Sequence, residues 1–315
     1  MTKILITGAD SMIGRELANF ITVVDDSVEL DLITHEECNL LNIEQVRTRF
    51  AISRPDFVYH LATYSGNIDF NRKYPADTFY KTTQMALNVL NIANTFKVKK
   101  VVNLLSSCCL TDKGDSVLNE EDMWNGLPNP TIECHGLAKR ILHAYSRQLY
   151  RQHGFISICA IANNSFGPFD GFSVEKTKVI GGLIKKFVEA KEKQLDEVVC
   201  WGDGSPKRSF VYSKDLVKLL NVVMFLYNNP LEPINLPQSI EISIKELAEK
   251  IKACVGFEGN IVWDTNKPNG QMRKHLDCFK FNQLANDIVI KFTNFDSALQ
   301  ETVDWYLKNK DTWTK

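Results

Sequence analysis

The clearest indication of the fold is the stretch KILITGADSMIG, residues 3–14. Residues 3–7 form an apolar run typical of a buried strand, and residues 13–21 have the apolar spacing of a helix. Glycines at positions 8 and 14 allow a tight turn in which the first N–H groups of the helix face an anion such as a pyrophosphate. The stretch therefore predicts a strand, a phosphate-binding turn and a helix, with an ordinary strand–helix turn as the alternative.

The same alternation of strand and helix continues to about residue 165. Further buried-strand runs occupy residues 28–33, 56–62, 100–107 and 156–163. Helical apolar spacing covers residues 43–53, 82–96 and 135–152. Strands separated by helices in this way are typical of a parallel sheet covered on both faces. We therefore predict an α/β protein whose residues 1–165 form a Rossmann-type, doubly wound, dinucleotide-binding domain.

The remaining residues, 166–315, have a different pattern. Short strand-like pieces at 197–204 and 259–265 alternate with turns rich in Gly, Pro and Asn and with amphipathic helices at 243–255 and 295–309. No repeat or low-complexity linker separates the two halves. We predict a smaller C-terminal α/β lobe packed against the first domain, to which some segments around 205–240 return.

The composition is that of a globular protein. Lys and Arg number 37 against 38 Asp and Glu, so no excess of positive charge favours nucleic acid. The longest apolar stretch, residues 219–227, is far shorter than the roughly 20 residues that cross a bilayer, and residues 1–10 lack the pattern of a secretory signal. The eight cysteines lack metal-ligand spacing. We expect a cytoplasmic protein with free thiols, no metal, and no membrane or nucleic acid as partner.

Four motifs in chain order carry a resemblance to a known family: SSC at 106–108, H-x-x-x-K at 135–139, WGDGSPKRSFVYSKDL at 201–216 and KPNGQMRKHLD at 267–277. With them the chain resembles, nearly end to end, the GDP-L-fucose synthases, NADP(H)-dependent epimerase/reductases of the extended short-chain dehydrogenase class. The resemblance implies a GDP-linked 4-keto-6-deoxy sugar as substrate. The family inverts carbons beside the ketone by removing and returning a proton, and then reduces C4 with hydride.

The resemblance implies catalytic roles at the end of one strand and on the next helix. Ser106 would hydrogen-bond the C4 oxygen, Lys139 would hold the nicotinamide ribose, and Cys108 would exchange a proton with the sugar. A cysteine suits that step because nearby positive charge lowers the pKa of a thiol. The alternative for Cys108 is one more buried thiol, since Cys109 follows it directly.

Basic and aromatic residues of the C-terminal lobe are expected to hold the nucleotide sugar. A diphosphate is best bound by charge-assisted donors, which arginine supplies as a rigid fork and lysine as a point charge. The resemblance implies these substrate-binding residues, with Lys207 beside them: Asn164, Lys186, Trp201, Arg208 and Lys274. Lys186 has the alternative of a solvated helix face.

The cofactor is expected at the first turn. The resemblance implies NADP(H), held by Lys139, by His35 after the second strand, and by the turn residues Gly8, Asp10, Ser11, Met12, Ile13 and Gly14. The arginines with which the family holds the 2′-phosphate fall on Asp10 and His35, and a family glycine falls on Ser11. An acid at this place favours a free 2′-hydroxyl, so NAD(H) stays open as the alternative.

Two substitutions fall on the chemistry itself, because His135 stands where the family has tyrosine and Lys178 where it has histidine. Imidazole ends roughly 2 Å short of a tyrosine oxygen, and its reference pKa of about 6.5 would be lowered by Lys139. We predict that His135 donates the proton for C4 reduction more weakly than tyrosine would. Lysine, with a reference pKa of about 10.4, shuttles protons poorly near pH 7. We therefore expect C3/C5 epimerisation to be weakened or absent.

The sequence thus predicts an NAD(P)H-dependent C4-ketoreductase of a GDP-linked 4-keto-6-deoxy hexose or heptose. Two alternatives stay open: an epimerase without net reduction, and a nucleotide-sugar-binding protein without turnover. Enzymes of this kind commonly pair through two helices of the first lobe, and residues 82–96 and 138–150 carry apolar stripes that suit this. We expect a homodimer, with packing of the stripes on the sheet as the alternative.

Overall fold

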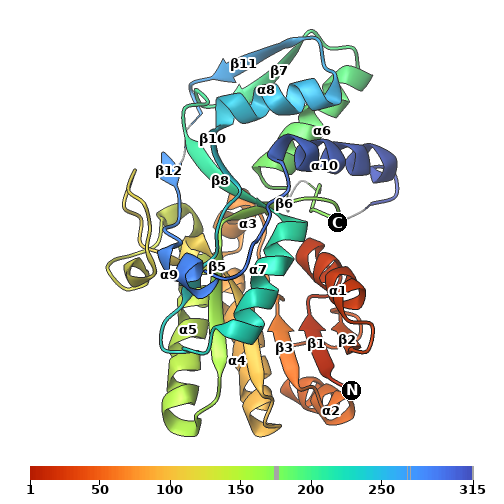
Figure 1. Cartoon of the computed structure of the whole chain (residues 1–315). Coiled ribbons are helices and arrows are strands. Elements are labelled where there is room, and N and C mark those ends of the chain that lie inside the picture. Colours follow the sequence, from red (N-terminus) through yellow and green to blue (C-terminus); the bar gives the residue numbers. More distant parts are fainter. Residues whose placement is uncertain (174–176, 268, 270, 314–315) are drawn as a thin grey trace.

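The computed structural model describes residues 1–173, 177–267, 269 and 271–313, which form a lower and an upper lobe (Figure 1). The lower lobe holds a six-stranded sheet in the order β2-β1-β3-β4-β5-β9, in which all neighbouring strands are parallel. Its strands are β1 Lys3–Thr7, β2 Glu29–Ile33, β3 Phe57–His60, β4 Lys100–Ser106, β5 Ser157–Ala162 and β9 Ile234–Asn235. Its helices are α1 Met12–Val24, α2 Ile43–Ser53, α3 Ile68–Lys73, α4 Pro75–Thr95, α5 Glu133–His153, α7 Ser213–Leu226 and α9 Phe279–Leu284. The prediction of an α/β protein with a Rossmann-type parallel sheet is confirmed.

Successive residues of β1 show how both faces of the sheet are covered. Ile4 and Ile6 belong to a core that includes residues of α1 and α7, whereas Leu5 belongs to a second core with α2, α4 and α5. All three side chains are at most 3% exposed. Because such strands are buried on both faces, their sequences are continuous apolar runs rather than an alternation of apolar and polar residues.

The predicted helices are present, and two of them begin earlier than expected. α4 begins at Pro75 because proline sits at the first helical position, where its missing N–H has no partner to lose. α5 runs from Glu133 to His153 and is closed by Gly154, whose φ is 67°. The helix α7 is absent from the sequence prediction. It contains most of the apolar stretch 219–227, and its apolar side chains pack with those of α1.

The upper lobe consists of short strands and helices around an aromatic core. One sheet has the order β10-β8-β12, with β6 pairing with β8, and β7 pairs with β11 separately. Phe166, Phe187 and Phe210 are at most 1% exposed and lie at its centre. The elements are β6 Asn164–Phe166, α6 Val179–Glu192, β7 Glu197–Trp201, β8 Lys207–Tyr212, β10 Ile240–Ser243, α8 Ile244–Val255, β11 Asn260–Asp264, β12 Arg273–Lys274 and α10 Phe295–Asn309.

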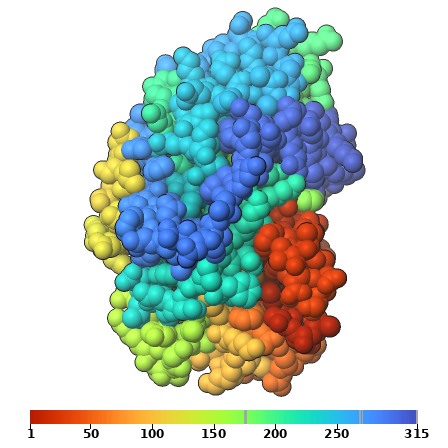
Figure 2. Space-filling view, viewed as in Figure 1, coloured from red at the N-terminus to blue at the C-terminus, as the bar shows by residue number. Residues whose placement is uncertain are grey.

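The upper lobe covers the carboxyl ends of the parallel strands (Figure 1). β4 leads into a short 3-10 helix, Ser107–Cys109, and β5 leads almost directly into β6, which pairs with β8. In Figure 2 the blue C-terminal residues reach from the upper lobe down over the lower one on this face. The edge at which open α/β sheets bind ligands is therefore the edge that faces the upper lobe.

Some general properties of the described residues bear on function. No helix among them has both the length and the apolar character needed to cross a membrane. The same residues hold no group of three or more His, Cys, Asp or Glu side chains that could bind a metal ion. All eight cysteines are unpaired.

Candidate active site

The turn after β1 is so tight that glycine is needed at two positions. Gly8 has a φ of 69°, and a Cβ on it would lie 3.0 Å from backbone atoms of Ala62. A Cβ on Gly14 would lie 2.3 Å from the carbonyl oxygen of Gly8. Ser11 is the N-cap of α1, and its hydroxyl accepts a hydrogen bond from the N–H of Gly14 over 3.1 Å. This bond explains how a serine serves where the family has a glycine.

The N-terminus of α1 fits the pyrophosphate of a dinucleotide. Met12 and Ile13 are the first two helical residues, so their N–H groups have no acceptor within the helix. These donors and the positive end of the helix dipole favour an anion. A nicotinamide dinucleotide bound here would supply the hydride chemistry, while the turn would hold its pyrophosphate.

Charges of both signs lie around the place expected for the 2′-position of the adenosine ribose. Asp10 lies in the turn, and its carbonyl oxygen accepts a hydrogen bond from Nε of Arg15 over 3.2 Å. His35 is exposed in the loop after β2, beside the exposed Glu36 and Glu37. The carboxylates oppose a 2′-phosphate, whereas Arg15 and a protonated His35 would favour one.

Two neighbouring serines at the end of β4 have different partners. The hydroxyl of Ser106 accepts a hydrogen bond from the N–H of Cys108 over 3.3 Å, which starts the 3-10 helix. Ser107 is buried and donates to Oδ1 of Asn163 over 3.0 Å. Ser106 is therefore the half-buried serine at the sheet edge, and Ser107 is held in the interior.

The helix α5 brings His135 and Lys139 to the same edge, one turn apart and both buried. Nζ of Lys139 donates to the carbonyl oxygen of Leu104 over 3.0 Å, which ties the helix to β4. Burial lowers the pKa of Lys139 to about 8. Burial, together with the charges of Lys139, Lys274 and Lys178, lowers the pKa of His135 to about 3. His135 is therefore neutral near pH 7.

The imidazole of His135 has one nitrogen to which a bound ligand would supply a hydrogen-bond partner. The side chain is 8% exposed, and its Nδ1 is buried without a hydrogen-bond partner among the described residues. Leaving a buried polar atom unpaired costs about 1–3 kcal/mol, so such atoms usually have a partner in the working molecule. An oxygen of a bound substrate would satisfy this nitrogen.

Cys108 and Cys109 are adjacent but have opposite surroundings. Sγ of Cys108 lies 3.1 Å from Nζ of Lys274. Burial raises the pKa of the Cys108 thiol, but Lys274, the Ser106 hydroxyl and Lys178 outweigh it, so this pKa lies below the usual range. Burial raises the pKa of Cys109 far above the usual range. Of this pair, Cys108 has the surroundings that suit proton transfer near neutral pH.

Lys274 reaches Cys108 from the upper lobe. It lies in β12, paired with Arg208 of β8, and its side chain is buried. Its carbonyl oxygen accepts a hydrogen bond from Nδ2 of Asn163 over 2.9 Å. Two residues of the motif to which Lys274 belongs, Pro268 and Gly270, lie outside the described residues.

Asn163 is a connecting residue that the sequence prediction lacks. It accepts from Ser107 and donates to Lys274, so it joins the end of β4 to the upper lobe. The neighbouring Asn164, which the prediction assigns to the substrate, donates from Nδ2 to the carbonyl oxygen of Ser209 over 3.2 Å. The one sequence signal for Asn163 is the repeated asparagine in NNSFGP, which cannot say which of the two faces the site.

Lys178 contributes charge to the site from its margin. It is the N-cap of α6, and its side chain is exposed. Its positive charge lowers the pKa of both His135 and Cys108. The structure therefore brings Lys178 within electrostatic range of these two residues.

Trp201 and several of the predicted substrate-binding cations lie in the upper lobe. The Trp201 ring is 58% exposed, and Nζ of Lys186 and of Lys267 lie 5.9 and 5.6 Å from its centre. Half-buried Arg208 donates from Nη1 to the carbonyl oxygen of Lys207 over 2.8 Å, and burial lowers the pKa of its guanidinium. An exposed aromatic ring beside cations suits a nucleoside diphosphate. Lys267 is absent from the sequence prediction.

Three buried, neutral histidines should make the protein sensitive to acid. Burial lowers the pKa of His60 and of His135 to about 3 and that of His143 to about 4, whereas an unfolded histidine titrates near about 6.5. Below about pH 6.5 the unfolded chain therefore binds more protons, so the free energy of unfolding falls as the pH drops. At pH 5 each histidine should lower it by about 2 kcal/mol relative to pH 8.

Urea unfolding at these two pH values checks this. We expect His135→Phe to lose about 2 kcal/mol less than the parent protein on acidification. The exposed His153 gives the matched control, because His153→Gln should lose as much as the parent. An equal loss in the parent and in His135→Phe would contradict the assignment of a buried neutral His135.

Comparison with known proteins agrees with this arrangement. Residues 4–236 match the model of the NAD dependent epimerase/dehydratase family. A putative GDP-L-fucose synthase 2 of Arabidopsis thaliana is 35% identical over 309 residues, covering 98% of this chain and 92% of the relative. The GDP-L-fucose synthase of Escherichia coli strain K12 is 32% identical over 321 residues, covering 98% of both chains. The crystal structure of a GDP-L-fucose synthetase from Naegleria fowleri bound to NADP has a TM-score of 0.91 at 30% identity, covering 100% of this chain and 96% of that one.

The chain is therefore an enzyme of the nicotinamide-dependent oxidoreductase class. It belongs to the NAD-dependent epimerase/dehydratase family and, within it, to the GDP-L-fucose synthases. The resemblance that the sequence motifs indicate is thereby confirmed.

Proposed function

We propose that this protein is an NAD(P)H-dependent C4-ketoreductase of a GDP-linked 4-keto-6-deoxy hexose or heptose, with weakened or absent C3/C5 epimerase activity. The observation that carries the proposal is the buried Nδ1 of His135, which has no hydrogen-bond partner among the described residues and lies on the helix that Lys139 ties to the end of β4. The names of the relatives support a GDP-linked sugar, and the NADP-bound relative supports NADP(H).

In this proposal His135 and Ser106 stabilise the charge that develops on the C4 oxygen. A neutral imidazole N–H can donate a hydrogen bond to an alkoxide without first being protonated. Lys139, with a pKa of about 8, is largely protonated at pH 7 and can replace a proton that His135 gives up. Because imidazole is shorter than phenol, we expect this transfer to be slower than with tyrosine.

The weakened epimerase activity is proposed from Lys178. Inversion of a carbon needs proton removal on one ring face and proton return on the other. Cys108 can serve one face, but a lysine side chain has a reference pKa of about 10.4 and exchanges its proton slowly near pH 7.

The second candidate function is epimerisation without net reduction. The observation that favours it is the contact between Cys108 and Lys274, which suits proton transfer to and from carbon. A third candidate is a nucleotide-sugar-binding protein without turnover, which the substitutions at His135 and Lys178 motivate.

Turnover of GDP-4-keto-6-deoxy-mannose by the purified protein tests all three. Loss of reduced-nicotinamide absorbance would be followed with NADPH and NADH in parallel, and we expect consumption of at least one. A product that keeps its C4 ketone but changes configuration would favour the epimerase. Tight binding of the sugar nucleotide with no hydride transfer at any pH would overturn the reductase and favour the binding protein.

The cofactor preference depends, in this proposal, on Asp10 and His35. A charge-assisted hydrogen bond contributes about 1.5–3 kcal/mol, so the double variant Asp10→Arg, His35→Arg should raise the preference for NADPH over NADH by about 10–100-fold. The ratio of the two dissociation constants, measured by fluorescence titration, checks this. Asp26→Arg is the matched control, since it reverses an exposed charge beyond the end of α1. An unchanged ratio in the double variant would show that other residues bind the 2′-position.

We also propose a homodimer formed through the outer faces of α4 and α5. These helices lie side by side below the upper lobe (Figure 1), and they expose Phe79, Tyr80, Ile141 and Tyr150. A groove of about 560 Å³ at their N-terminal ends is lined in part by Phe79 and Leu137. Light scattering should give twice the mass of the chain, and a monomer at micromolar concentration would overturn this proposal.

A further inference from the structure

A buried lysine from the upper lobe contacts the cysteine at the end of β4. Lys274 is 7% exposed. Its Nζ lies 3.1 Å from Sγ of Cys108, and this sulfur accepts a hydrogen bond from the ammonium group. Removing an ammonium ion from water costs several kcal/mol unless an opposite charge and hydrogen bonds compensate. A thiolate at Cys108 provides that opposite charge, and a neutral thiol does not.

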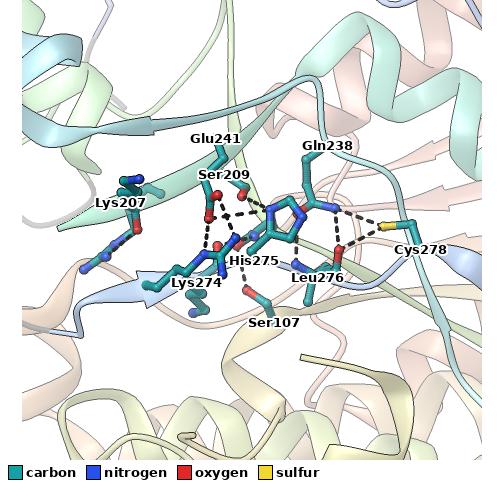
Figure 3. Close-up of polar contacts among 12 residues, drawn as sticks. Ser107, Lys207, Ser209, Gln238, Glu241, Lys274, His275, Leu276 and Cys278 are labelled. Atoms are coloured by element: carbon teal, nitrogen blue, oxygen red, sulfur yellow. Dashed lines mark hydrogen bonds and ion pairs between the residues drawn. The ribbon is translucent and has the colours of Figure 1, made fainter. Parts of the chain in front are cut away.

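The position of Lys274 is fixed by the residues before and after it in the chain; Figure 3 labels Lys274, His275 and their partners Ser209 and Glu241. Before it, Arg273 donates from Nε and Nη2 to the carboxylate of Glu241 over 2.7 and 2.9 Å. After it, Nδ1 of His275 lies 2.8 Å from the hydroxyl of Ser209. With both flanking residues bound to β8 and β10, the Lys274 side chain is directed toward Cys108 rather than free to choose another partner.

The rest of the surroundings also favour a thiolate. The titratable and polar groups near Cys108 include Lys274, Lys178, Ser106, His135, Cys109 and Cys134. Asp112 lines the same small cavity, and its carboxylate accepts hydrogen bonds from Nδ2 of Asn129 and Nε2 of Gln271 over 2.7 and 3.1 Å. The two lysines are positive, and His135 is neutral near pH 7. Burial raises the pKa of Cys109 and of Cys134, so both stay neutral thiols. Among the described residues, the charges that act on the Cys108 pKa are those of the two lysines, and both favour its ionisation.

We infer that Lys274 is a positioning residue that holds Cys108 as a thiolate, so that the site keeps a base although lysine replaces the family histidine at position 178. In a role that rests on the proposed function, the thiolate takes a proton from the carbon beside the ketone, and the electron pair of that C–H bond moves to the C4 oxygen as an enolate. The thiol then returns a proton to the same face. When the thiol exchanges the proton it has taken with water before returning one, solvent hydrogen enters the sugar without inversion.

Alkylation of the whole apo protein with iodoacetamide tests the ionisation without any substrate. The rate at Cys108 is measured by peptide mass spectrometry from pH 5 to 10, with Cys109 in the same peptide as an internal reference. We expect a half-maximal rate below about pH 8.5, the value of an ordinary thiol. Lys274→Met should raise this midpoint by at least about one pH unit, a tenfold lower rate at pH 7, whereas Lys274→Arg should keep it low.

Two further measurements serve as controls for this test. Lys250→Met removes a surface lysine that pairs with Asp296, and it should leave the midpoint unchanged. If Lys274→Met does not fold, the difference in absorbance at 240 nm between the parent and Cys108→Ser gives the thiolate directly across the same pH range.

An unchanged midpoint in folded Lys274→Met, or a parent midpoint at or above about 8.5, would overturn the inference. Neither measurement depends on hydride transfer, so a failure of the proposed reductase activity would leave them unaffected.

Discussion

Replacing His135 by phenylalanine is expected to lower the rate of C4 reduction by about 10²–10⁴-fold, the usual contribution of a positioned proton donor. Phenylalanine keeps a buried aromatic ring but removes both nitrogens, including the Nδ1 that has no partner among the described residues. The glycine turn and Arg208 lie on other elements, so binding of cofactor and sugar nucleotide should change far less. Single-turnover oxidation of NADPH, with binding measured separately by calorimetry, distinguishes the two effects.

The conservative variant His135→Tyr sharpens this test. It restores the residue of the family, whose oxygen reaches roughly 2 Å further than an imidazole nitrogen, so reduction should be at least as fast as in the parent protein. A role limited to filling space would predict similar rates for the phenylalanine and tyrosine variants. Reduction by His135→Phe as fast as by the parent protein would remove His135 from the mechanism.

The lower lobe could be predicted because its signals are local. In residues 3–24 the strand, the turn and the helix follow one another directly, and each is set by apolar spacing and by glycine. α7 escaped prediction because apolar residues crowd its second half, 219–226, so that its sequence shows no clear polar face. The start of α4 was missed because a proline at the first helical position, Pro75, rather than apolar spacing sets the boundary.

The candidate site depends on contacts that no local pattern contains. Lys274 and Cys108 are 166 residues apart in sequence, and β12 has only two residues, too few for any periodicity. The motifs predicted that both belong to the site but assigned Lys274 to the nucleotide sugar rather than to the thiol. Asn163 joins the two lobes because it accepts a hydrogen bond from the Ser107 side chain and donates one to the backbone carbonyl of Lys274. These bonds form when the lobes pack together, so the residues next to Asn163 in the sequence do not indicate them.

The substitution Gly14→Ala should abolish cofactor binding and destabilise the protein by about 3 kcal/mol or more, since overpacking against backbone cannot be relieved by a rotamer change. A Cβ at this position would lie 2.3 Å from the carbonyl oxygen of Gly8 and 2.7 Å from Cα of Ala9. The turn would have to open, which would also break the hydrogen bond from Gly14 to Ser11 and displace the first N–H groups of α1. Urea unfolding and fluorescence titration with NADPH measure the two losses.

Gly181 provides the matched control, because it also lies in the first turn of a helix and is buried. A Cβ there would lie 3.4 Å from the ring of Phe172, an ordinary van der Waals contact. Gly181→Ala should therefore leave NADPH binding unchanged and leave stability equal or up to about 1 kcal/mol higher, because alanine favours helix over glycine. Equally tight binding of NADPH by Gly14→Ala and Gly181→Ala would contradict this prediction. The pyrophosphate would then bind not at the tight turn after β1 but elsewhere along the carboxyl edge of the sheet.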